Sequence, residues 1–263
     1  MASTIGPEAS AALQARWMEK DGEHAWLEEV EGESALTWVK DINANCLSEL
    51  GDPASKASYQ RVLSILDSKE KIPHPRKIGE YYYNFWQDAE NPRGLWRRTT
   101  PESYRQPEPE WEVVLDVDAL GAAEDISWVY AGHTLLEEED GSPPSRTLMK
   151  LSRGGSDANV VREFDLVTKA FVEGGFELPE AKSRVSWVHR DLLLVGTDLG
   201  EGSLTDSGYP RQVREWARGT PLKEAPLMYE GEATDVAVSG YLGFHAGHAF
   251  EWRRRSTTFY TSK

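Results

Sequence analysis

One serine in the chain stands in a setting that could support nucleophilic catalysis. The stretch LSRGGSDANVV, residues 151–161, places Ser156 two residues after Gly154, as in the glycine-flanked serine of serine hydrolases. That motif needs a second glycine two residues later and then a helix, because the serine sits on a sharp strand-to-helix turn. Here Ala158 replaces the glycine, and NVVREFDL has the pattern of a strand. We therefore predict that Ser156 lies in a turn and that the chain contains no catalytic residue.

The histidines and the single cysteine form no recognisable metal-binding motif. The six histidines are His24, His74, His133, His189, His245 and His248. No pair has the H-E-x-x-H spacing of a zinc site, and one cysteine cannot make a cysteine-based site. His245 and His248 stand three residues apart in GFHAGHAF, which favours a loop between strands over a metal clip. Cys46 lies among apolar residues at helical spacing, so we predict a buried structural thiol and expect no metal or cofactor.

Two further segments have the composition of ligand-binding loops without the required spacing. EEED at 137–140, followed by GSPP, lacks the alternating ligands of a calcium loop and is typical of a solvated hairpin tip. GEGSL at 200–204 is rich in glycine, but it has no lysine and no following helix, so it does not predict a phosphate-binding loop.

Charge and composition exclude several classes of partner. The 263 residues carry a formal net charge of -15, which argues against binding DNA or RNA. The basic run Arg253–Arg255 lies in a strand-like segment and is typical of a solvated face. No signal peptide and no apolar run of about 20 residues is visible, so no membrane contact is expected. The single cysteine fits a reducing compartment, and we expect a cytoplasmic protein.

The elements that must position any site change character near residue 72. Before it, Ala35, Trp38, Val39, Ile42 and Cys46 recur at three- and four-residue steps, which indicates a helix. We expect Ser34 to cap that helix and Gly51 to end it, with Asp52 and Pro53 beginning the next helical turn. After KIPHPRK, short runs rich in Val, Trp, Tyr and Phe alternate with turn residues, which indicates strands.

The strand-like region also contains an internal repeat. DISWV at 125–129 and RVSWV at 184–188 share Ser-Trp-Val, and the repeat starts fall near residues 78, 126, 185 and 236. A period near 50 with about four strands in each unit is typical of β-propeller blades, which must stack on one another to bury their faces. An antiparallel sandwich with accidental spacing is the alternative.

Several stretches resemble the prolyl oligopeptidase family of serine peptidases. The family opens with a Trp-Leu-Glu element, Ala-Leu-x-Trp-Val and an asparagine four residues later. The matching residues are Trp26, Leu27, Glu28, Ala35, Leu36, Trp38, Val39 and Asn43. The similarity continues through YYYNFWQDAENPRGLWRRT, LSRGGSDANVVREFDL, FVEGGFELPEAKSRVSWV, GTDLGEGSLTDSGYPRQVREWARGTPL and EGEATDVAVS. It covers most of residues 24–240.

The resemblance implies an architecture and a function. Family members carry an N-terminal helical segment, a seven-bladed propeller that gates access for short peptides, and a C-terminal α/β-hydrolase domain with the catalytic triad. We therefore expect a mainly β chain, with a helical segment at 1–72 and a partial propeller of three to four four-stranded blades at 73–263. The chain would be the gating part of a peptidase that cleaves proline-containing peptides when joined to its missing hydrolase domain.

The alternative is a non-catalytic propeller that binds other proteins. A complete module of that kind should close its ring or cap its last blade, whereas FEWRRRSTTFYTSK does neither, so the sequence favours a fragment. Open blade edges would also allow self-association.

Overall fold

The computed structural model describes residues 22–29, 31–138 and 140–263. The chain divides into two compact units, Met1–Asp67 and Ser68–Lys263. The first is helical where it is described, and the second is built from antiparallel sheets, so the expected mainly β fold with helices first is confirmed. No helix in the described part of the chain has both the length and the apolar composition of a membrane span.

The helical unit includes α-helices and short 3-10 turns. The elements with described bounds are η1 (Ala25–Glu28), α2 (Glu33–Leu50), η2 (Pro53–Ser55) and α3 (Ala57–Leu66). The prediction for Ser34 was wrong, because α2 begins at Glu33 after Gly32 and has no side-chain cap. Gly51 ends α2 with a φ of 78°, and the Asp52 carboxylate accepts the Ala54 N–H at the start of η2, as predicted.

Most apolar side chains of this helical unit are exposed. The edge of the Trp26 ring meets Trp38, with centroids 6.3 Å apart, but the helices leave their apolar faces largely uncovered within the unit. The prediction that Cys46 is buried was wrong: its thiol is exposed on α2, as are several apolar side chains at the same helical spacing, so this spacing did not mark a covered face. The exposed apolar residues of α2 and α3 include Leu36, Trp38, Val39, Ile42, Leu50, Val62, Ile65 and Leu66.

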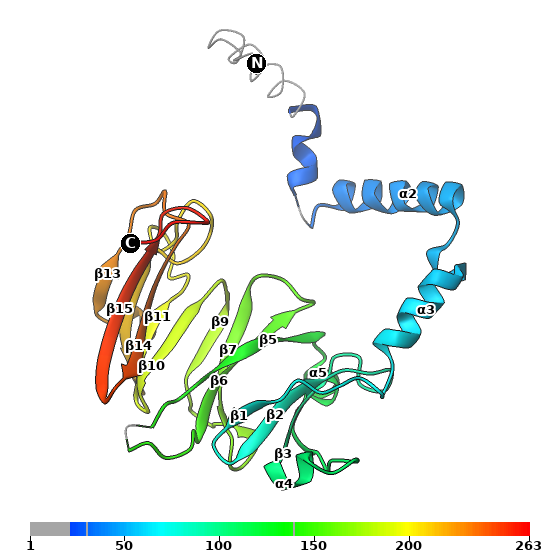
Figure 1. Cartoon of the computed structure of the whole chain (residues 1–263). Helices are drawn as coiled ribbons and strands as arrows, with labels where there is room; N and C mark the ends of the chain where they lie inside the picture. Colours follow the sequence, from blue (N-terminus) through cyan, green and yellow to red (C-terminus); the bar gives the residue numbers. More distant parts are fainter. Residues whose placement is uncertain (1–21, 30, 139) are drawn as a thin grey trace, which may run out of the picture. The chain divides into compact units, whose positions relative to one another are not determined.

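Four antiparallel sheets follow one another in chain order in the second unit (Figure 1). The first sheet contains β1 (Arg76–Ile78), β2 (Tyr81–Trp86), β3 (Leu95–Thr99) and β4 (Glu112–Asp116). The second contains β5 (Trp128–Leu135), β6 (Arg146–Arg153), β7 (Asn159–Asp165) and β8 (Ala170–Phe171), with β9 (Glu177–Ala181) also paired to β7. The third contains β10 (Arg184–His189), β11 (Leu192–Gly196), β12 (Gln212–Ala217) and β13 (Leu227–Glu230). The fourth contains β14 (Ala237–His245) and β15 (His248–Ser256).

Short helices connect some of these strands. They are α4 (Pro101–Tyr104), α5 (Val117–Glu124) and η3 (Leu222–Glu224). Thr100 caps α4 by accepting the Ser103 N–H, and Asp116 caps α5 by accepting the Ala119 N–H. Both caps satisfy backbone donors that a helix start otherwise leaves unpaired.

Neighbouring sheets bury their faces against each other. Successive side chains of a strand point to opposite faces. On β6, Met149 belongs to the core shared with the first sheet, while Leu148 belongs to the core shared with the third. On β11, Leu193 packs into that same core and Leu194 packs toward the fourth sheet. This two-sided burial is the packing that propeller blades require, and it excludes a simple two-layer sandwich.

A buried ion-pair network joins the second and third sheets. Glu163 on β7 is 2% exposed, and Arg218 after β12 donates to both of its carboxylate oxygens, at 2.8 and 3.1 Å. Arg146 on β6 lies 3.5 Å from the same carboxylate, and the Phe176 N–H donates to it at 2.9 Å. A carboxylate removed from water in this way is stable only because charged and hydrogen-bonding partners surround it.

Candidate functional site on the first strands

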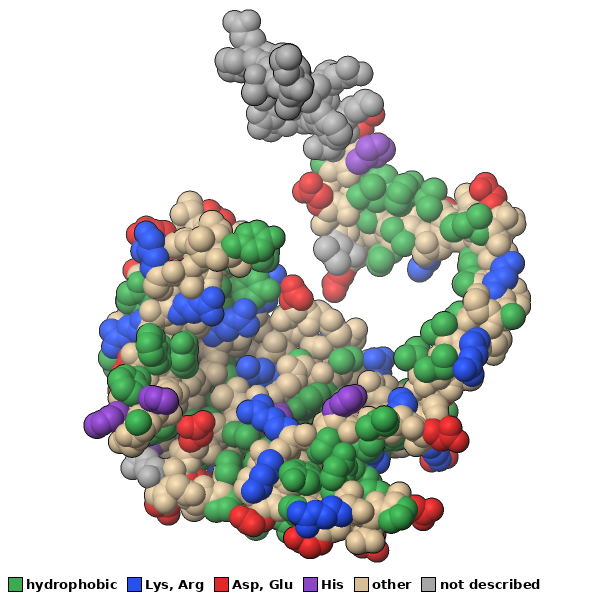
Figure 2. Space-filling model, viewed as in Figure 1, with side chains coloured by type: hydrophobic (Ala, Val, Ile, Leu, Met, Phe, Trp, Pro, Cys, Tyr) green, Lys and Arg blue, Asp and Glu red, His purple; other side chains and the backbone are tan. Residues whose placement is uncertain are grey.

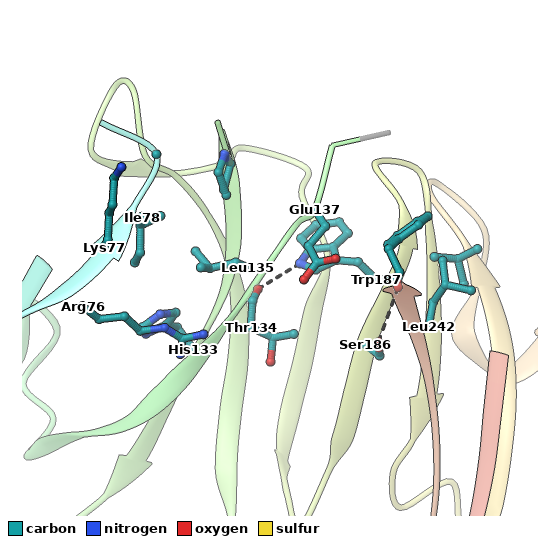
Figure 3. A pocket seen from close by; sticks show the side chains of 14 residues that line it. Arg76, Lys77, Ile78, His133, Thr134, Leu135, Glu137, Ser186, Trp187 and Leu242 are labelled. Carbon is teal, nitrogen blue, oxygen red and sulfur yellow. Dashed lines mark hydrogen bonds between the residues drawn. The ribbon is translucent and has the colours of Figure 1, made fainter. Parts of the chain in front are cut away.

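The first strands of all four sheets line one cavity of about 420 Å³ (Figure 3). The lining side chains come from β1, β5, β10 and β14 and from the connection after β5. They are Arg76, Lys77, Ile78, His133, Thr134, Leu135, Glu137, Pro144, Ser186, Trp187, Val188, Leu242 and Phe244, with Gly79. The lining combines charged and polar side chains with apolar ones, so it offers both hydrogen-bonding groups and apolar contacts to a bound molecule.

A β-bulge in β5 brings the side chain of Tyr130 to His133, which lines this wall. The pairing of β5 with β6 shifts between Tyr130 and His133, and Gly132 within the shift has a φ of 107°. Only glycine adopts such a backbone readily. In a regular strand, residues three apart point to opposite faces, whereas a bulge changes that alternation. The Tyr130 hydroxyl therefore contacts Nδ1 of His133.

His133 is held as a neutral ring. Burial, together with the positive charges of Arg76 and Lys150, lowers the pKa of His133 from 6.5 to about 4. Burial raises the pKa of Tyr130, so its hydroxyl stays protonated. The ring also packs at 4.8 Å, centroid to centroid, from Trp96. Nε2 of His133 is buried and has no hydrogen-bond partner in the described part of the protein.

The tautomer of His133 follows from its contacts. If Tyr130 donates to Nδ1, then Nε2 carries the proton, and this N–H is the one group left unpaired. If Nδ1 donated instead, both the tyrosine proton and the Nε2 lone pair would be unpaired. Because each unpaired buried polar group costs about 1–3 kcal/mol, the first arrangement is favoured. His133 thus presents an unpaired N–H donor beside the cavity.

A hydrogen bond between sheets fixes the opposite side of the wall. The Trp187 indole N–H on β10 donates to the Thr134 carbonyl of β5 at 2.9 Å, and Trp187 itself is buried. The same carbonyl accepts the Thr147 hydroxyl at 3.0 Å. Two donors from different strands therefore hold the C-terminal end of β5 in place.

Replacing Trp187 with phenylalanine should reduce the free energy of unfolding by about 2 kcal/mol. The change removes one hydrogen bond and part of a buried ring. Trp216→Phe is the matched control, because that indole donates within its own sheet, to the Thr220 carbonyl at 2.8 Å. Both variants should lower stability, but only Trp187→Phe should accelerate amide hydrogen exchange in β5. Equal exchange in β5 for the two variants would contradict this role of Trp187.

The sequence matches a family of proteins whose N-terminal domain is a β-propeller. The family model of the prolyl oligopeptidase N-terminal β-propeller domain matches residues 20–246. The chain belongs to the prolyl oligopeptidase family. The resemblance expected from the sequence motifs is thereby confirmed, and residues 20–246 correspond to the family's N-terminal propeller region.

Relatives in this family include two uncharacterized bacterial peptidases. The peptidase y4nA of Sinorhizobium fredii is 40% identical over 218 residues, covering 81% of this chain and 29% of that protein. The peptidase RP174 of Rickettsia prowazekii is 32% identical over 229 residues, covering 82% of this chain and 31% of that protein. The chain therefore spans about a third of the length of these relatives.

Solved structures of prolyl oligopeptidase relatives share the fold. A post-proline cleaving enzyme from Rickettsia typhi is 29% identical, with a TM-score of 0.81, over 92% of this chain and 36% of that one. Oligopeptidase B from Leishmania major is 11% identical, with a TM-score of 0.62, over 87% of this chain and 30% of that one, which shows the fold alone.

Of the residues considered in the sequence, His133 and Glu137 line the cavity, whereas Ser156, His245 and His248 do not. Ser156 lies in the turn between β6 and β7, where its hydroxyl donates to the Ala158 carbonyl at 3.1 Å. His245 and His248 face each other at the tip of the β14–β15 hairpin. Within the residues that the structure describes, no group of three His, Cys, Asp or Glu side chains is close enough to hold a metal ion.

The loop segments GEGSL at 200–204 and EEED at 137–140 differ in what their side chains contact. Ser203 in GEGSL is buried, donates to the Gly200 carbonyl at 2.6 Å and accepts the Leu199 N–H at 2.9 Å, so its hydroxyl closes a turn. In EEED, Glu138 is not simply solvated, because Arg190 and the Ser145 hydroxyl donate to it at 2.9 and 2.7 Å. Glu137 lines the cavity, and Glu139 lies outside the described residues.

Within the basic run Arg253–Arg255, Arg255 forms an ion pair with a carboxylate of the same chain, whereas Arg254 is exposed. Arg255 donates to both oxygens of the Asp235 carboxylate, at 2.8 and 3.1 Å. Hydrophobic side chains also gather over the surrounding hairpin (Figure 2). The exposed ones on β14 and β15 are Tyr241, Phe244, Phe250 and Trp252.

Sequence reasoning missed Arg76, His133 and Trp187 as members of one site. The available signal was the internal repeat, since Ile78 and Val185 lie in β1 and β10, which both line the cavity. In a propeller-like repeat, equivalent strands of successive blades occupy equivalent radial positions. The side chains on both sides of each repeat start were therefore the group to inspect together.

Proposed function

We propose that this chain supplies the helical segment and the first part of the gating propeller of a peptidase that acts on short proline-containing peptides. In this proposal, the cavity on the first strands forms part of the route by which peptides reach a hydrolase domain. The observation that carries it is the convergence of β1, β5, β10 and β14 on one cavity. The 29% identity to a post-proline cleaving enzyme supports the choice of substrate class.

The cavity is suited to selecting substrates by size. A volume of about 420 Å³ can hold part of an extended peptide but not a folded domain. Its wall is built from strands held by cross-sheet bonds such as Trp187 to Thr134, so it resists widening. Apolar side chains such as Leu135 and Leu242 can contact a peptide, while the chemistry of peptide-bond cleavage would come from the hydrolase domain.

The exposed apolar surfaces support a hydrolase partner. Leu50, Val62 and Leu66 on the helices are 71, 55 and 61% exposed, and Trp252 on β15 is 53% exposed. Covering such surface is favourable by about 25 cal/mol for each Å² removed from water. In this proposal, the hydrolase domain covers the helices, and further propeller strands cover β15.

A chimera tests the proposed function. The matching third of the Sinorhizobium fredii peptidase would be replaced by this chain, and cleavage of a chromogenic Gly-Pro peptide would be measured. We expect cleavage by the chimera, no cleavage by the isolated chain, and no labelling of the isolated chain by a fluorophosphonate probe. The same Gly-Pro sequence inside a folded protein should remain intact.

Two results would overturn this proposal. One is stoichiometric labelling of the isolated chain that Ser156→Ala abolishes, because it would place the nucleophile here. The other is a folded chimera with an intact triad that cleaves the folded protein as fast as the short peptide.

A further inference from the structure

The cavity wall carries a cation without an anionic partner. Arg76 on β1 is exposed, and within the residues that the structure describes it has no ion pair and no hydrogen bond. Figure 3 shows its side chain extending toward the ring of His133. Glu137 lines the same cavity, but no ion pair joins its carboxylate to Arg76, so the guanidinium remains open to an anionic ligand.

His133 adds a hydrogen-bond donor at the same place. Its Nε2–H is unpaired, and the positive charges of Arg76 and Lys150 both act on the ring. Lys150 also lacks an anionic partner in the described part of the chain, and its neighbouring charge is that of Arg184. The environment of His133 is thus positive and contains a donor that no protein acceptor satisfies.

An anion with two oxygens would match both groups. Guanidinium groups bind carboxylates through two parallel hydrogen bonds, and such charge-assisted bonds are about twice as strong as neutral ones. Nε2 of His133 is buried, so a bound carboxylate reaches it only when the side chains that cover it move aside. A peptide offers a carboxylate at its C-terminus, and the cavity beyond Arg76 offers apolar contacts at Leu135, Trp187 and Leu242.

We propose that this cavity binds the free C-terminal carboxylate of a peptide, with Arg76 as its anchor and the Nε2–H of His133 as a second donor. This assignment rests on the proposed function, since it assumes that peptides enter the cavity. It adds a selection rule, because a peptide with a free C-terminus is retained in preference to one that is amidated. The peptide released when a bond after proline is cut also ends in such a carboxylate.

The test compares N-acetyl-Gly-Pro with a free carboxylate and its C-terminal amide, titrated against residues 1–263 by calorimetry. We expect the acid to bind at least about tenfold more tightly than the amide. Arg76→Gln should abolish that preference. Arg254→Gln is the matched control, because it removes the same charge from an exposed strand residue that does not line the cavity. Thermal melting would verify that both exposed-site variants remain folded.

Nuclear magnetic resonance locates the bound acid. The ring signals of His133, assigned with His133→Gln, should shift with the acid and remain unchanged with the amide. Inorganic phosphate is the third ligand, and binding as tight as that of the acid would mean a general anion site and overturn the peptide assignment.

Three further outcomes would also overturn the carboxylate site. They are equal binding of acid and amide by the unchanged chain, retention of the preference in Arg76→Gln, and no binding of either peptide. Equal binding would leave peptide entry, and so the proposed function, intact. Failure of both peptides to bind would leave the proposed function to be decided by the activity of the chimera.

Discussion

Replacing Glu163 with glutamine is expected to lower the free energy of unfolding of residues 68–263 by about 3 kcal/mol. The substitution keeps the shape of the side chain and an acceptor for the Phe176 N–H, but it removes the charge that Arg218 and Arg146 face. Breaking a buried ion pair typically costs about 3–5 kcal/mol. The lower value applies here because Arg218 retains Asp191 and Arg146 retains Asp165.

The matched control for this substitution is Glu112→Gln. Glu112 on β4 also joins two sheets, since Lys169 of the second sheet donates to it at 2.6 Å, but its side chain is 45% exposed. Exposed ion pairs contribute about 0–1 kcal/mol. Urea denaturation followed by tryptophan fluorescence should therefore separate the two variants clearly. Equal losses in the two would show that burial does not determine the strength of these cross-sheet pairs.

The stability of the sheet unit should fall by up to about 3 kcal/mol between pH 6.5 and pH 4 because of His133. The pKa of this residue is about 4 in the folded protein and 6.5 ordinarily, and each pKa unit corresponds to about 1.4 kcal/mol. Above pH 6.5 the ring is neutral in both states. As the pH falls, the unfolded chain takes up a proton that the folded protein refuses, so stability decreases until both states are protonated below pH 4.

The variant His133→Gln isolates this contribution. Carboxyl groups titrate in both proteins, so the difference between the two stabilities reports His133. That difference should be constant above pH 6.5 and should shift in favour of the variant by up to about 3 kcal/mol at pH 4. A constant difference over the whole range, measured by urea denaturation at each pH, would contradict a buried neutral His133.

The fold class was accessible from the sequence because it depends on short-range patterns. Helical spacing before residue 72 and runs of Val, Trp and Tyr after it are local properties, and the repeated Ser-Trp-Val marks equivalent strands. The capping of α2 was misjudged because serine and glycine can both precede a helix. The exposure of Cys46 was misjudged because helical periodicity identifies an apolar face but not what covers it.

The candidate site could not be predicted from the sequence. It depends on a bulge that interrupts the alternation of β5 and on contacts between residues that are far apart in the chain. VYAGHTL has the composition of a continuous strand, in which Tyr130 and His133 would point to opposite faces. The bulge at Gly132 brings them together. Glu163 and Arg218 are 55 residues apart in the chain, and no local pattern predicts that they meet.

The order of the sheets has a consequence for biosynthesis. Each of the four sheets is made of consecutive strands, and buried residues of the second, third and fourth sheets pack against the sheet that comes before them in the chain. A ribosome releases the chain from its N-terminal end, so every sheet can form as soon as its own residues emerge. The surface on which the next sheet condenses, such as the face of β6 that carries Leu148, is then already in place when β10 and β11 leave the exit tunnel. Synthesis and stacking thus proceed in the same direction, because the strands β1 to β13 complete the first three sheets in the order in which they are translated.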